Sequence, residues 1–339
     1  MKEFRVGMLG FGNVMQAFVG HYLAIADRIK DFGFSLRFVA YCDTGQCVYD
    51  QKLDVQHALD MKKQHTVAAK TQAPLEQFAA LIGSHCFDIL IDALPSSKTD
   101  AGPSFPLLCE ALKKKITVIS VNKAPLVFGG GALFNLSRQF KTFLGISGTT
   151  AGCLPTSGII MNELVGSEIL SMRGILNGTS NYVLDRMMFD RLSCEQAAEK
   201  AVELGIAEPD YRFDLDGTDT CFKMIILGLL TTGTAVRPED VVCSGIMDLD
   251  QKYVQRIASQ DKVIRLIGTL TNTETVPDIS VRPQVLDPGD PLFAVRGTGK
   301  GLTFQTIYMG DLTVIGGSSG RTNIAATIMK DIINACKAS

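Results

Sequence analysis

The pattern of apolar and polar positions in the first half of the chain predicts buried strands separated by helices. Continuous apolar runs are typical of parallel strands covered on both faces. Such runs span residues 4–9, 87–94 and 116–121, and residues 35–42 and 142–148 are predicted as further strands. Helical patterns cover residues 51–65 and 105–115, and another follows Gly12. This alternation predicts an α/β fold with a Rossmann-type parallel sheet, with residues 1–148 as a nucleotide-binding domain.

The second half of the chain has a different order of elements. Its predicted helices span residues 156–165, 180–190, 193–204 and 322–336, and its predicted strands span residues 170–175, 263–270, 278–282 and 301–308. We therefore expect residues 149–316 to form a second domain of the α+β class. The last helix, within residues 317–339, is expected to return and complete the nucleotide-binding domain.

Composition argues against several classes of protein and of site. The 339 residues are 46% hydrophobic and 20% charged, which is typical of an ordinary globular protein. A net charge of −2 provides no basic surface for nucleic acid, and neither a membrane span nor a signal peptide is recognisable, so we expect a cytoplasmic protein. The nine cysteines contain no CxxC pair, and His21, His57, His65 and His85 show no ligand spacing, so no metal site is expected.

A glycine turn after the first strand indicates a dinucleotide site. The run Gly10-Phe11-Gly12-Asn13-Val14-Met15 joins a strand to a helix, where Gly10 permits the tight turn and Gly12 lets backbone N–H groups approach a pyrophosphate. Met15 stands where a third glycine is usual. Asp43 ends the second strand and is placed to bind the adenosine ribose, which favours NAD over NADP. Stabilisation of the turn Asp43-Thr44-Gly45 explains this aspartate nearly as well.

Two later strand ends carry polar side chains. Pro95-Ser96-Ser97 closes one apolar run, and Asn122-Lys123-Ala124-Pro125 closes the next. Ligands of open α/β sheets bind at the carboxyl ends of the strands, so Lys123 is a candidate for chemistry. The alternative is a solvated lysine that opens a loop.

Residues 208–223 contain five carboxylates ahead of one lysine. They are Glu208, Asp210, Asp214, Asp216, Asp219 and Lys223. The helix that follows is apolar on every face and is therefore expected to be buried. Asp219 lies one turn before Lys223 on the same face, in the favourable acid-before-base order. The alternative is ordinary capping, with Asp216 as N-cap, Asp219 stabilising the helix dipole and Lys223 extending to water.

A turn rich in Asn, Gly and Thr precedes this block. Residues 176–182, Leu-Asn-Gly-Thr-Ser-Asn-Tyr, are suited to present backbone N–H groups and hydroxyls to a small polar ligand. Alternatively, Thr179 or Ser180 is simply the N-cap of the next helix.

Together these segments resemble the homoserine dehydrogenase family. The resemblance covers Gly174–Tyr182, Leu204-Gly205 and the acidic block at 208–223; Val121–Leu126 is similar to the family's lysine loop, Thr150–Pro155 to its interdomain turn and Gly316-Gly317-Ser318-Ser319-Gly320 to its nicotinamide-side glycine loop. From the length we expect the family's short form, which has no C-terminal regulatory domain.

The resemblance implies the NAD(P)-dependent interconversion of L-homoserine and L-aspartate 4-semialdehyde in threonine and methionine biosynthesis. Carried over by position, the catalytic residues are Lys223, Lys123 and Asp219, and the substrate-binding residues are Glu208, Asp214, Gly178 and Thr179. The cofactor-binding residues are Gly10, Gly12, Asn13, Val14, Asp43, Pro95, Ser96, Asn122 and Gly320. A partly desolvated lysine with its pKa lowered toward neutrality can both donate and accept the reacting proton. A homodimer through the open face of the second sheet is also implied.

Two other functions remain as alternatives. An aspartate-semialdehyde dehydrogenase needs a cysteine nucleophile with a histidine base, and Cys153 is the nearest candidate, but no histidine follows His85. A non-catalytic nucleotide-binding protein would account for the missing third glycine, yet it would not need the two lysines with Asp219.

Overall fold

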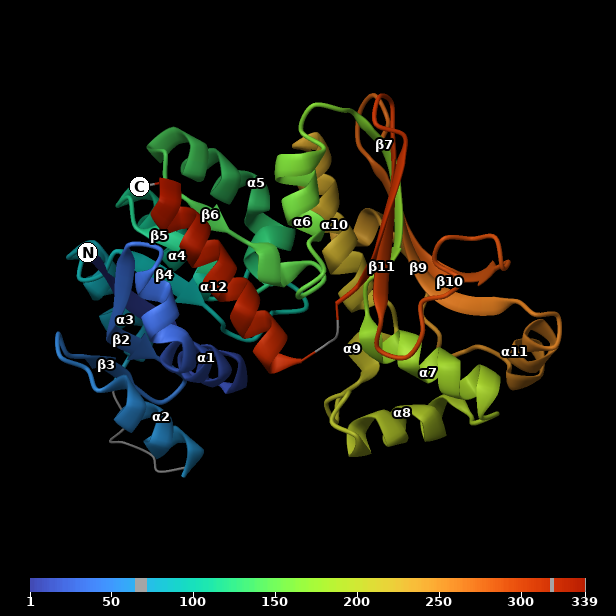
Figure 1. Cartoon of the computed structure of the whole chain (residues 1–339), viewed down its shortest axis with the longest axis horizontal. Coiled ribbons are helices and arrows are strands. Elements are labelled where there is room, and N and C mark those ends of the chain that lie inside the picture. The colour runs from blue at the N-terminus through green and yellow to red at the C-terminus, as the bar shows by residue number, and fades with distance from the viewer. Residues whose placement is uncertain (65–71, 318–319, 339) are drawn as a thin grey trace. The chain divides into compact units, whose positions relative to one another are not determined.

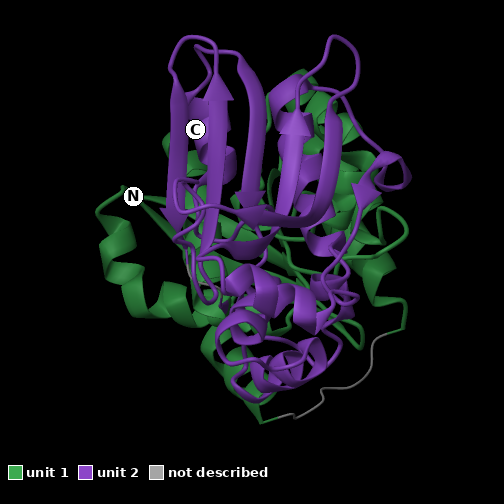
Figure 2. Cartoon of the chain, turned by 90° about the vertical axis from the view of Figure 1, so that its right-hand side faces the viewer, with its two compact units in different colours: residues 1–149, 321–339 green, residues 150–320 purple. Residues whose placement is uncertain are grey.

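The computed structural model describes residues 1–64, 72–317 and 320–338. His65, and Ser318 and Ser319 of the glycine loop, lie outside these ranges. The chain divides into two compact units, Met1–Thr149 with Arg321–Ser339 and Thr150–Gly320 (Figure 2). We call them unit 1 and unit 2.

Unit 1 is built on a six-stranded sheet in the order β3-β2-β1-β4-β5-β6 (Figure 1). The strands are β1 (Lys2–Leu9), β2 (Phe34–Cys42), β3 (Cys47–Tyr49), β4 (Ile89–Asp92), β5 (Thr117–Ser120) and β6 (Leu144–Gly145). All neighbouring strands are parallel except β3, which pairs antiparallel with β2. The Rossmann-type fold is thus confirmed; β3 was not predicted.

Helices cover both faces of this sheet, as its two-sided apolar strands require. They are α1 (Asn13–Lys30), α2 (Val55–Lys63), α3 (Pro74–Gly83), α4 (Ser104–Lys113), α5 (Ala124–Phe140) and α12 (Arg321–Ala338). Helix α12 lies beside α1, and its buried Ile328 and Ile332 join the core of unit 1 (Figure 1). The short 3-10 helix η1 (Ser147–Thr149) ends the first segment of the unit.

The strand register brings several carboxyl ends to one edge of the sheet. Leu9 pairs with Cys42 of β2 on one side and with Asp92 of β4 on the other, and Asp92 pairs with Ser120 of β5. The segments that follow these strands carry the residues predicted to bind the cofactor. The edge is where an α/β sheet binds its ligands.

Unit 2 has a second six-stranded sheet, in the order β12-β11-β7-β9-β10-β8. The strands are β7 (Ile169–Ile175), β8 (Val242–Cys243), β9 (Val263–Thr271), β10 (Asp278–Leu286), β11 (Lys300–Thr306) and β12 (Asp311–Gly316). Neighbours pair antiparallel except β10 with β8. The sheet confirms the predicted α+β character of this part of the chain.

The first two helices of unit 2 precede β7, and the others lie in the chain segments between its strands. They are α6 (Thr156–Gly158), the π-helix η2 (Ile159–Glu163), α7 (Gly178–Phe189), α8 (Cys194–Glu203), α9 (Arg212–Leu215), α10 (Thr218–Thr232), the 3-10 helix η3 (Pro238–Asp240) and α11 (Gln251–Ala258). The single helix predicted over residues 156–165 is wrong in kind, because one α-turn runs directly into the π-helix. Its bounds are otherwise close to those expected.

Helix α10 packs on β9 and β10, and its residues Met224 to Leu229 are all buried, as the all-round apolar pattern predicted. Gly268 of β9 permits this contact, since a Cβ there would lie 2.5 Å from the Cγ of Met224. Figure 2 turns the opposite face of this sheet toward the viewer.

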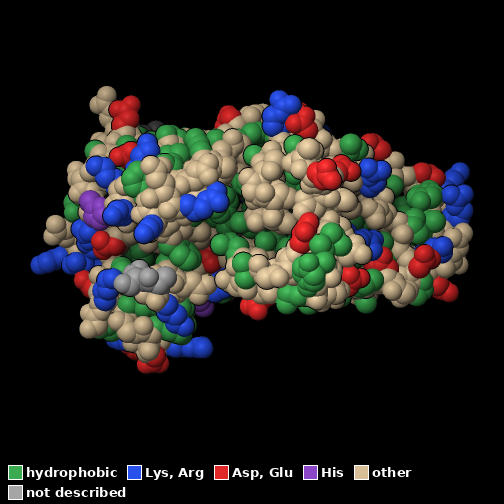
Figure 3. All heavy atoms as spheres, turned by 90° about the horizontal axis from the view of Figure 1, so that it is seen from above, with side chains coloured by type: hydrophobic (Ala, Val, Ile, Leu, Met, Phe, Trp, Pro, Cys, Tyr) green, Lys and Arg blue, Asp and Glu red, His purple; other side chains and the backbone are tan. Residues whose placement is uncertain are grey.

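Within the described residues, no helix is both long and apolar enough to cross a membrane. Basic and acidic side chains are interspersed over the face seen in Figure 3, in keeping with the small net charge.

Candidate active site

The first turns of α10 hold a buried ion pair. Asp219 Oδ2 lies 2.5 Å from Lys223 Nζ, and the two side chains are 7% and 12% exposed. Lys223 also donates a hydrogen bond of 2.8 Å to the carbonyl of Leu176, directly after β7. The interpretation that Lys223 extends to water is therefore wrong, because its ammonium is turned toward the end of β7.

The start of α10 explains how both side chains reach this position. Gly217 is the N-cap with φ +91°, a conformation that favours glycine. Asp216 precedes it and accepts a 2.8 Å hydrogen bond from the backbone N–H of Thr218. Asp216 was predicted as N-cap, and this is wrong by one residue. Asp219 occupies the first turn, where a carboxylate also stabilises the helix dipole.

Asn177 links the ion pair to a second carboxylate. Its Nδ2 donates 2.7 Å to Asp214 Oδ1 and 2.8 Å to Asp219 Oδ2, while its Oδ1 accepts from the backbone N–H of Ser180. Asn177 is therefore the N-cap of α7, and the expectation of Thr179 or Ser180 at that position is wrong. These opposite contacts fix which end of the side chain is oxygen and which is nitrogen.

Asp214 is the carboxyl group whose proton affinity this environment changes. Burial raises the pKa of Asp214, and the negative charge of Asp219 raises it further. Hydrogen bonds from Asn177 and Thr179 and the charge of Lys223 oppose the shift without cancelling it. Two carboxylates thus share the amide of Asn177, and one of them also pairs with the ammonium of Lys223.

The structure brings most of the predicted residues of unit 2 into one group. Gly178 and Thr179 open α7, directly after Asn177, and Thr179 contacts Asp214. Glu208 lies in the exposed loop between α8 and α9. Asn177 was not predicted as a site residue, although the Asn-Gly-Thr turn that contains it was.

A further lysine, missed by the sequence analysis, belongs to the same group. Lys300 opens β11 and is only 4% exposed, and its pKa is lowered to about 8 by burial and by the charge of Lys223. Asp219 and Cys153 oppose this shift. The only signal in the sequence is a lone lysine between Gly299 and Gly301 ahead of an apolar strand.

In unit 1, Lys123 lies between β5 and α5. It is half-buried, occupies the N-cap position of α5, and its backbone N–H donates to Ser96 Oγ at 2.9 Å. Asn122 is buried and donates to Ser104 Oγ at 3.1 Å, while its Oδ1 accepts from the N–H of Ala124. Lys123 therefore opens a helix and not a solvated loop.

A buried carboxyl group lies beneath this turn. Asp92, at the end of β4, is fully buried, and it accepts hydrogen bonds from Ser120 Oγ and from the backbone N–H of Leu94. Burial raises its pKa to about 6, although hydrogen bonds that include those from Ser104 and Asn122 lower it. Asp92 was not predicted; an acid inside the apolar run at 87–94 was the available signal.

The glycine turn has the form that a dinucleotide requires. Gly10 has φ +88°, and a Cβ there would lie 2.7 Å from the carbonyl oxygen of Ala93. A Cβ on Gly12 would meet nothing within 4 Å, so the backbone at the start of α1 is open to a ligand. Asn13 is exposed, Val14 is half-buried, and Met15 is fully buried in the core of unit 1.

Asp43 has three partners of its own. Its Oδ1 accepts from the N–H groups of Gly45 and Gln46, and its Oδ2 pairs with Lys62. Burial raises the pKa of Asp43, but the hydrogen bond from Lys62 and those from the turn outweigh it, so the pKa is lowered. The turn-stabilising interpretation is therefore correct, and it does not exclude a ribose contact.

The remaining predicted cofactor residues lie at segment ends. Pro95 is exposed and Ser96 is half-buried after β4, while Gly320 precedes α12 with φ +151°. Within the described residues, no group of three His, Cys, Asp or Glu side chains could hold a metal ion. Cys153 is exposed, and unit 2 contains no histidine that could serve it as a base.

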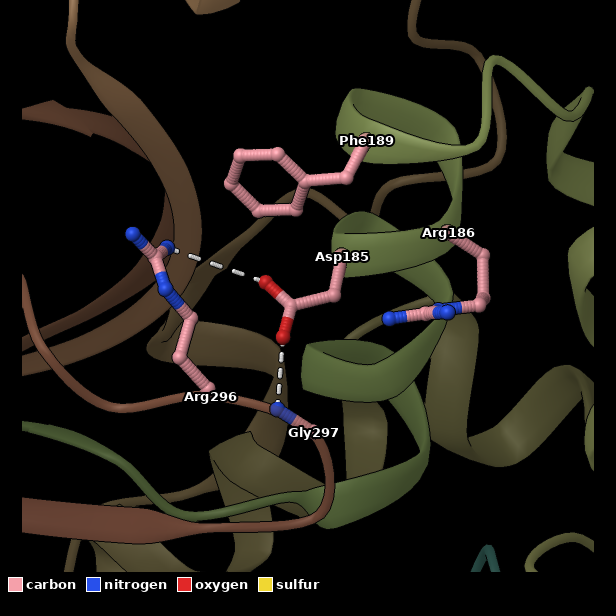
Figure 4. Close-up of a pocket in the computed structure, with 5 residues that line it drawn as sticks. All are labelled: Asp185, Arg186, Phe189, Arg296 and Gly297. Atoms are coloured by element: carbon pink, nitrogen blue, oxygen red, sulfur yellow. Dashed lines mark hydrogen bonds and ion pairs between the residues drawn. The ribbon is translucent and has the colours of Figure 1, made fainter.

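Unit 2 also contains an open cavity of about 580 Å³ that is lined by other residues (Figure 4). It is lined by Asp185, Arg186, Phe189, Arg296 and Gly297. Asp185 accepts from the Gly297 N–H at 2.6 Å and pairs with the fully buried Arg265 at 2.8 Å. We interpret these residues as structural, because the buried pair of Asp185 and Arg265 joins α7 to β9.

A sequence profile of the homoserine dehydrogenase family matches residues 138–333, more than half of the chain. The chain belongs to this family. It is accordingly an NAD(P)-dependent oxidoreductase, and the resemblance stated from the sequence is confirmed.

Individual family members match along almost the whole chain. An NAD(+)-dependent homoserine dehydrogenase of Pseudomonas canavaninivorans is 28% identical over 98% of this chain and 96% of its own. The crystal structure of a putative homoserine dehydrogenase from Archaeoglobus fulgidus has a TM-score of 0.86 at 27% identity, covering 98% of each chain. A hyperthermophilic archaeal homoserine dehydrogenase in complex with NADPH shares the fold, with a TM-score of 0.83 at 23% identity over 99% of this chain and 98% of its own.

Proposed function

We propose that the chain interconverts L-homoserine and L-aspartate 4-semialdehyde, with the Lys223–Asp219 pair handling the proton of the reacting oxygen. The observation that carries this proposal is the buried ion pair at 2.5 Å, bridged by Asn177 to Asp214. A lysine held out of water beside one carboxylate is suited to proton transfer. Family membership supports the identity of the substrate.

The residues of unit 1 fit a dinucleotide. Gly10 excludes a side chain where the chain turns most tightly, and Gly12 leaves the backbone at the start of α1 open. The N–H groups of the first turn of α1, at Asn13 and Val14, would bind the pyrophosphate. When bound, the nicotinamide ring accepts or donates the hydride.

Oxidation of homoserine requires removal of the hydroxyl proton, and reduction of the aldehyde requires its return. In our proposal Lys223 gives its proton to the carbonyl oxygen as the aldehyde is reduced, and takes it from the hydroxyl in the other direction. Asp219 orients Lys223 and stabilises its charged form. We assign Lys123 to proton transfer together with Lys223. The position of Lys123 at the carboxyl end of β5 supports this assignment.

We assign the amino-acid end of the substrate to the residues around Asn177. The carboxylates of Asp214 and Glu208 would bind the α-ammonium, and the hydroxyl of Thr179 with the N–H of Gly178 would bind the α-carboxylate. The start of α7 supports the second assignment, since Gly178 and Thr179 are its first two residues and N–H groups at such positions can bind an anion. The N–H of Ser180 is already bound by Asn177.

We further propose that NAD is the preferred cofactor. The support is Asp43 at the end of β2, whose carboxylate would repel a 2′-phosphate. Lys62, paired with Asp43, opposes this preference by offering a cation at the same place. One relative is NAD(+)-dependent by name and one structural neighbour is a complex with NADPH, so the family includes both.

We also propose a homodimer through the open face of the unit 2 sheet. A row of half-buried polar residues crosses four strands of that sheet: Thr313, Thr303, Arg173 and Thr269. Light scattering after gel filtration tests this proposal. A monomer at micromolar concentration contradicts it.

A steady-state assay of homoserine with NAD and with NADP tests the activity. Lys223→Ala is expected to lower kcat at least 100-fold and to leave the Kd for NADH, measured by fluorescence, within twofold. Lys252→Ala, at an exposed lysine of α11, is the matched control and is expected to retain wild-type rates. If the wild type oxidises homoserine with neither cofactor, the proposal is wrong.

A further inference from the structure

Lys300 lies where the chain of unit 2 begins and ends. Its Nζ donates a hydrogen bond of 3.4 Å to the carbonyl of Gly317, in the segment that leaves the unit. The same atom lies 3.8 Å from the position that a Cβ on Gly152 would occupy, in the segment that enters the unit. A single ammonium is thus next to both segments.

These two segments are themselves packed together. A Cβ on Gly317 would lie 2.9 Å from the backbone nitrogen of Leu154, and Gly152 and Gly317 have φ +60° and +68°. Glycine adopts these positive φ values most readily, and a side chain on Gly317 would collide with the backbone of Leu154. Lys300 Nζ therefore lies beside a junction with little space for other side chains.

The strand register relates the same ammonium to the group around Asn177, Asp219 and Lys223. Lys300 pairs in register with Gly316 of β12, and its neighbour Gly301 pairs with Ile175, two residues before Asn177. Burial and the charge of Lys223 lower the pKa of Lys300 to about 8, while Cys153 and Asp219 act in the opposite direction. Lys300 therefore responds to charges on α10 and on the entering segment.

A buried ammonium is costly unless it is satisfied by acceptors or opposite charge. The nearby carboxylate, Asp219, already binds Lys223 at 2.5 Å and Asn177 at 2.8 Å. A lysine in this position can donate hydrogen bonds to backbone carbonyls and can place a positive charge near Lys223.

We infer that Lys300 is a positioning residue of the proposed active site, which ties the Gly316–Gly317 segment to the start of β11 and places a second positive charge beside the Lys223–Asp219 pair. The inference deepens the proposed function and rests on it for the identity of the reaction. Lys300 acts through Lys223 and is not assigned a contact with the substrate.

Three variants separate positioning from simple stability. Lys300→Met keeps the length of the side chain and removes the charge, Lys300→Arg keeps the charge, and Lys300→Ala leaves space for an added amine. We expect Lys300→Met to lower kcat for homoserine at least tenfold with KM within threefold, and Lys300→Arg to recover most of this loss. Methylammonium should partly restore Lys300→Ala, and tetramethylammonium, which cannot donate a hydrogen bond, should not.

A pH profile adds a readout that a purely structural role would not change. In the wild type, kcat should change across a titration near pH 8, and this step should be absent in Lys300→Met. Equal kcat and an unchanged profile in the folded Lys300→Met variant would overturn the inference. So would a loss of rate that matches only the loss of folded protein in a thermal melt.

A measurement without turnover distinguishes this inference from the proposed function. Carbon-13 NMR of reductively methylated protein, with the Lys300 signal assigned by its absence in Lys300→Arg, gives the titration of Lys300 directly. Removing the charge in Lys223→Met should move that titration to higher pH. An unmoved titration overturns the inference even if homoserine is oxidised; a moved titration supports it even if another hydroxy amino acid is the substrate.

Discussion

Asp219 and Lys223 form an ion pair one helical turn apart, with both side chains almost removed from water and 2.5 Å between Oδ2 and Nζ. Such a pair is not retained for stability alone, because apolar residues in the same volume are often as stabilising. The free-energy cost of burying both charges is consistent with the proton transfer proposed for Lys223.

Removing the carboxylate tests this relationship. Asp219→Ala leaves the ammonium of Lys223 buried without its partner, and we expect the free energy of unfolding to fall by about 3 kcal/mol. We expect kcat for homoserine to fall at least 100-fold. Chemical denaturation and steady-state kinetics measure the two effects. Asp240→Ala, which removes an exposed partner of Arg237, is the control and should leave the stability nearly unchanged.

The pair was predictable from the sequence, and its bridging residue was not. Four residues of spacing on an all-apolar helix place Asp219 and Lys223 on one face whatever the rest of the fold does. Asn177 meets Asp214 and Asp219 only through tertiary contacts, 37 and 42 residues away along the chain. Lys300 is a similar case, because an isolated lysine before a strand has no local pattern that indicates burial.

Helix α5 shows why some elements of the fold were missed as well. Its second residue is proline and its centre is Gly129-Gly130-Gly131, which weakens the helical pattern. Gly129 is required by packing, since a Cβ there would lie 2.2 Å from the ring of Phe105 in α4. The glycines therefore serve a contact between two helices that one segment of sequence cannot show.

Replacing Asn177 by aspartate tests its role between the two carboxylates. Asn177→Asp places a third carboxylate between Asp214 and Asp219 and removes the amide that both accept. We expect loss of homoserine oxidation and a fall of about 3 kcal/mol in the free energy of unfolding at pH 7, smaller at pH 4 where carboxyl groups are protonated. Denaturation at the two pH values measures it. An equal loss at both would contradict the charge argument.

The buried Asp92 makes stability depend on pH in a defined window. Burial raises its pKa from 3.8 to about 6, so the folded protein binds the proton more tightly than the unfolded chain does. Its contribution is therefore present below pH 4 and is lost as pH rises through 6, by about 3 kcal/mol. Urea denaturation should show this fall in the wild type relative to Asp92→Asn, which cannot ionise. Parallel curves for the two proteins would show that Asp92 does not titrate there.

Lys300 gives a dependence at alkaline pH. Its pKa is lowered from 10.5 to about 8, so between these values the unfolded chain binds more protons than the folded protein. The free energy of unfolding of the wild type should therefore rise by about 3 kcal/mol from pH 8 to 10.5, relative to Lys300→Met. Below pH 8 the difference between the two proteins should be constant. Urea titrations of both proteins at several pH values measure it.

The choice between the two cofactors rests on Asp43 and Lys62. Asp43→Ser removes the charge that would repel a 2′-phosphate and leaves Lys62 available to bind one. We expect KM for NADP to fall at least fivefold and KM for NAD to rise, because the ribose loses its acceptor. Lys62→Met in the wild-type background should weaken NADP and leave NAD nearly unchanged. If Asp43→Ser weakens both cofactors equally, Asp43 serves the Asp43–Gln46 turn and not the ribose.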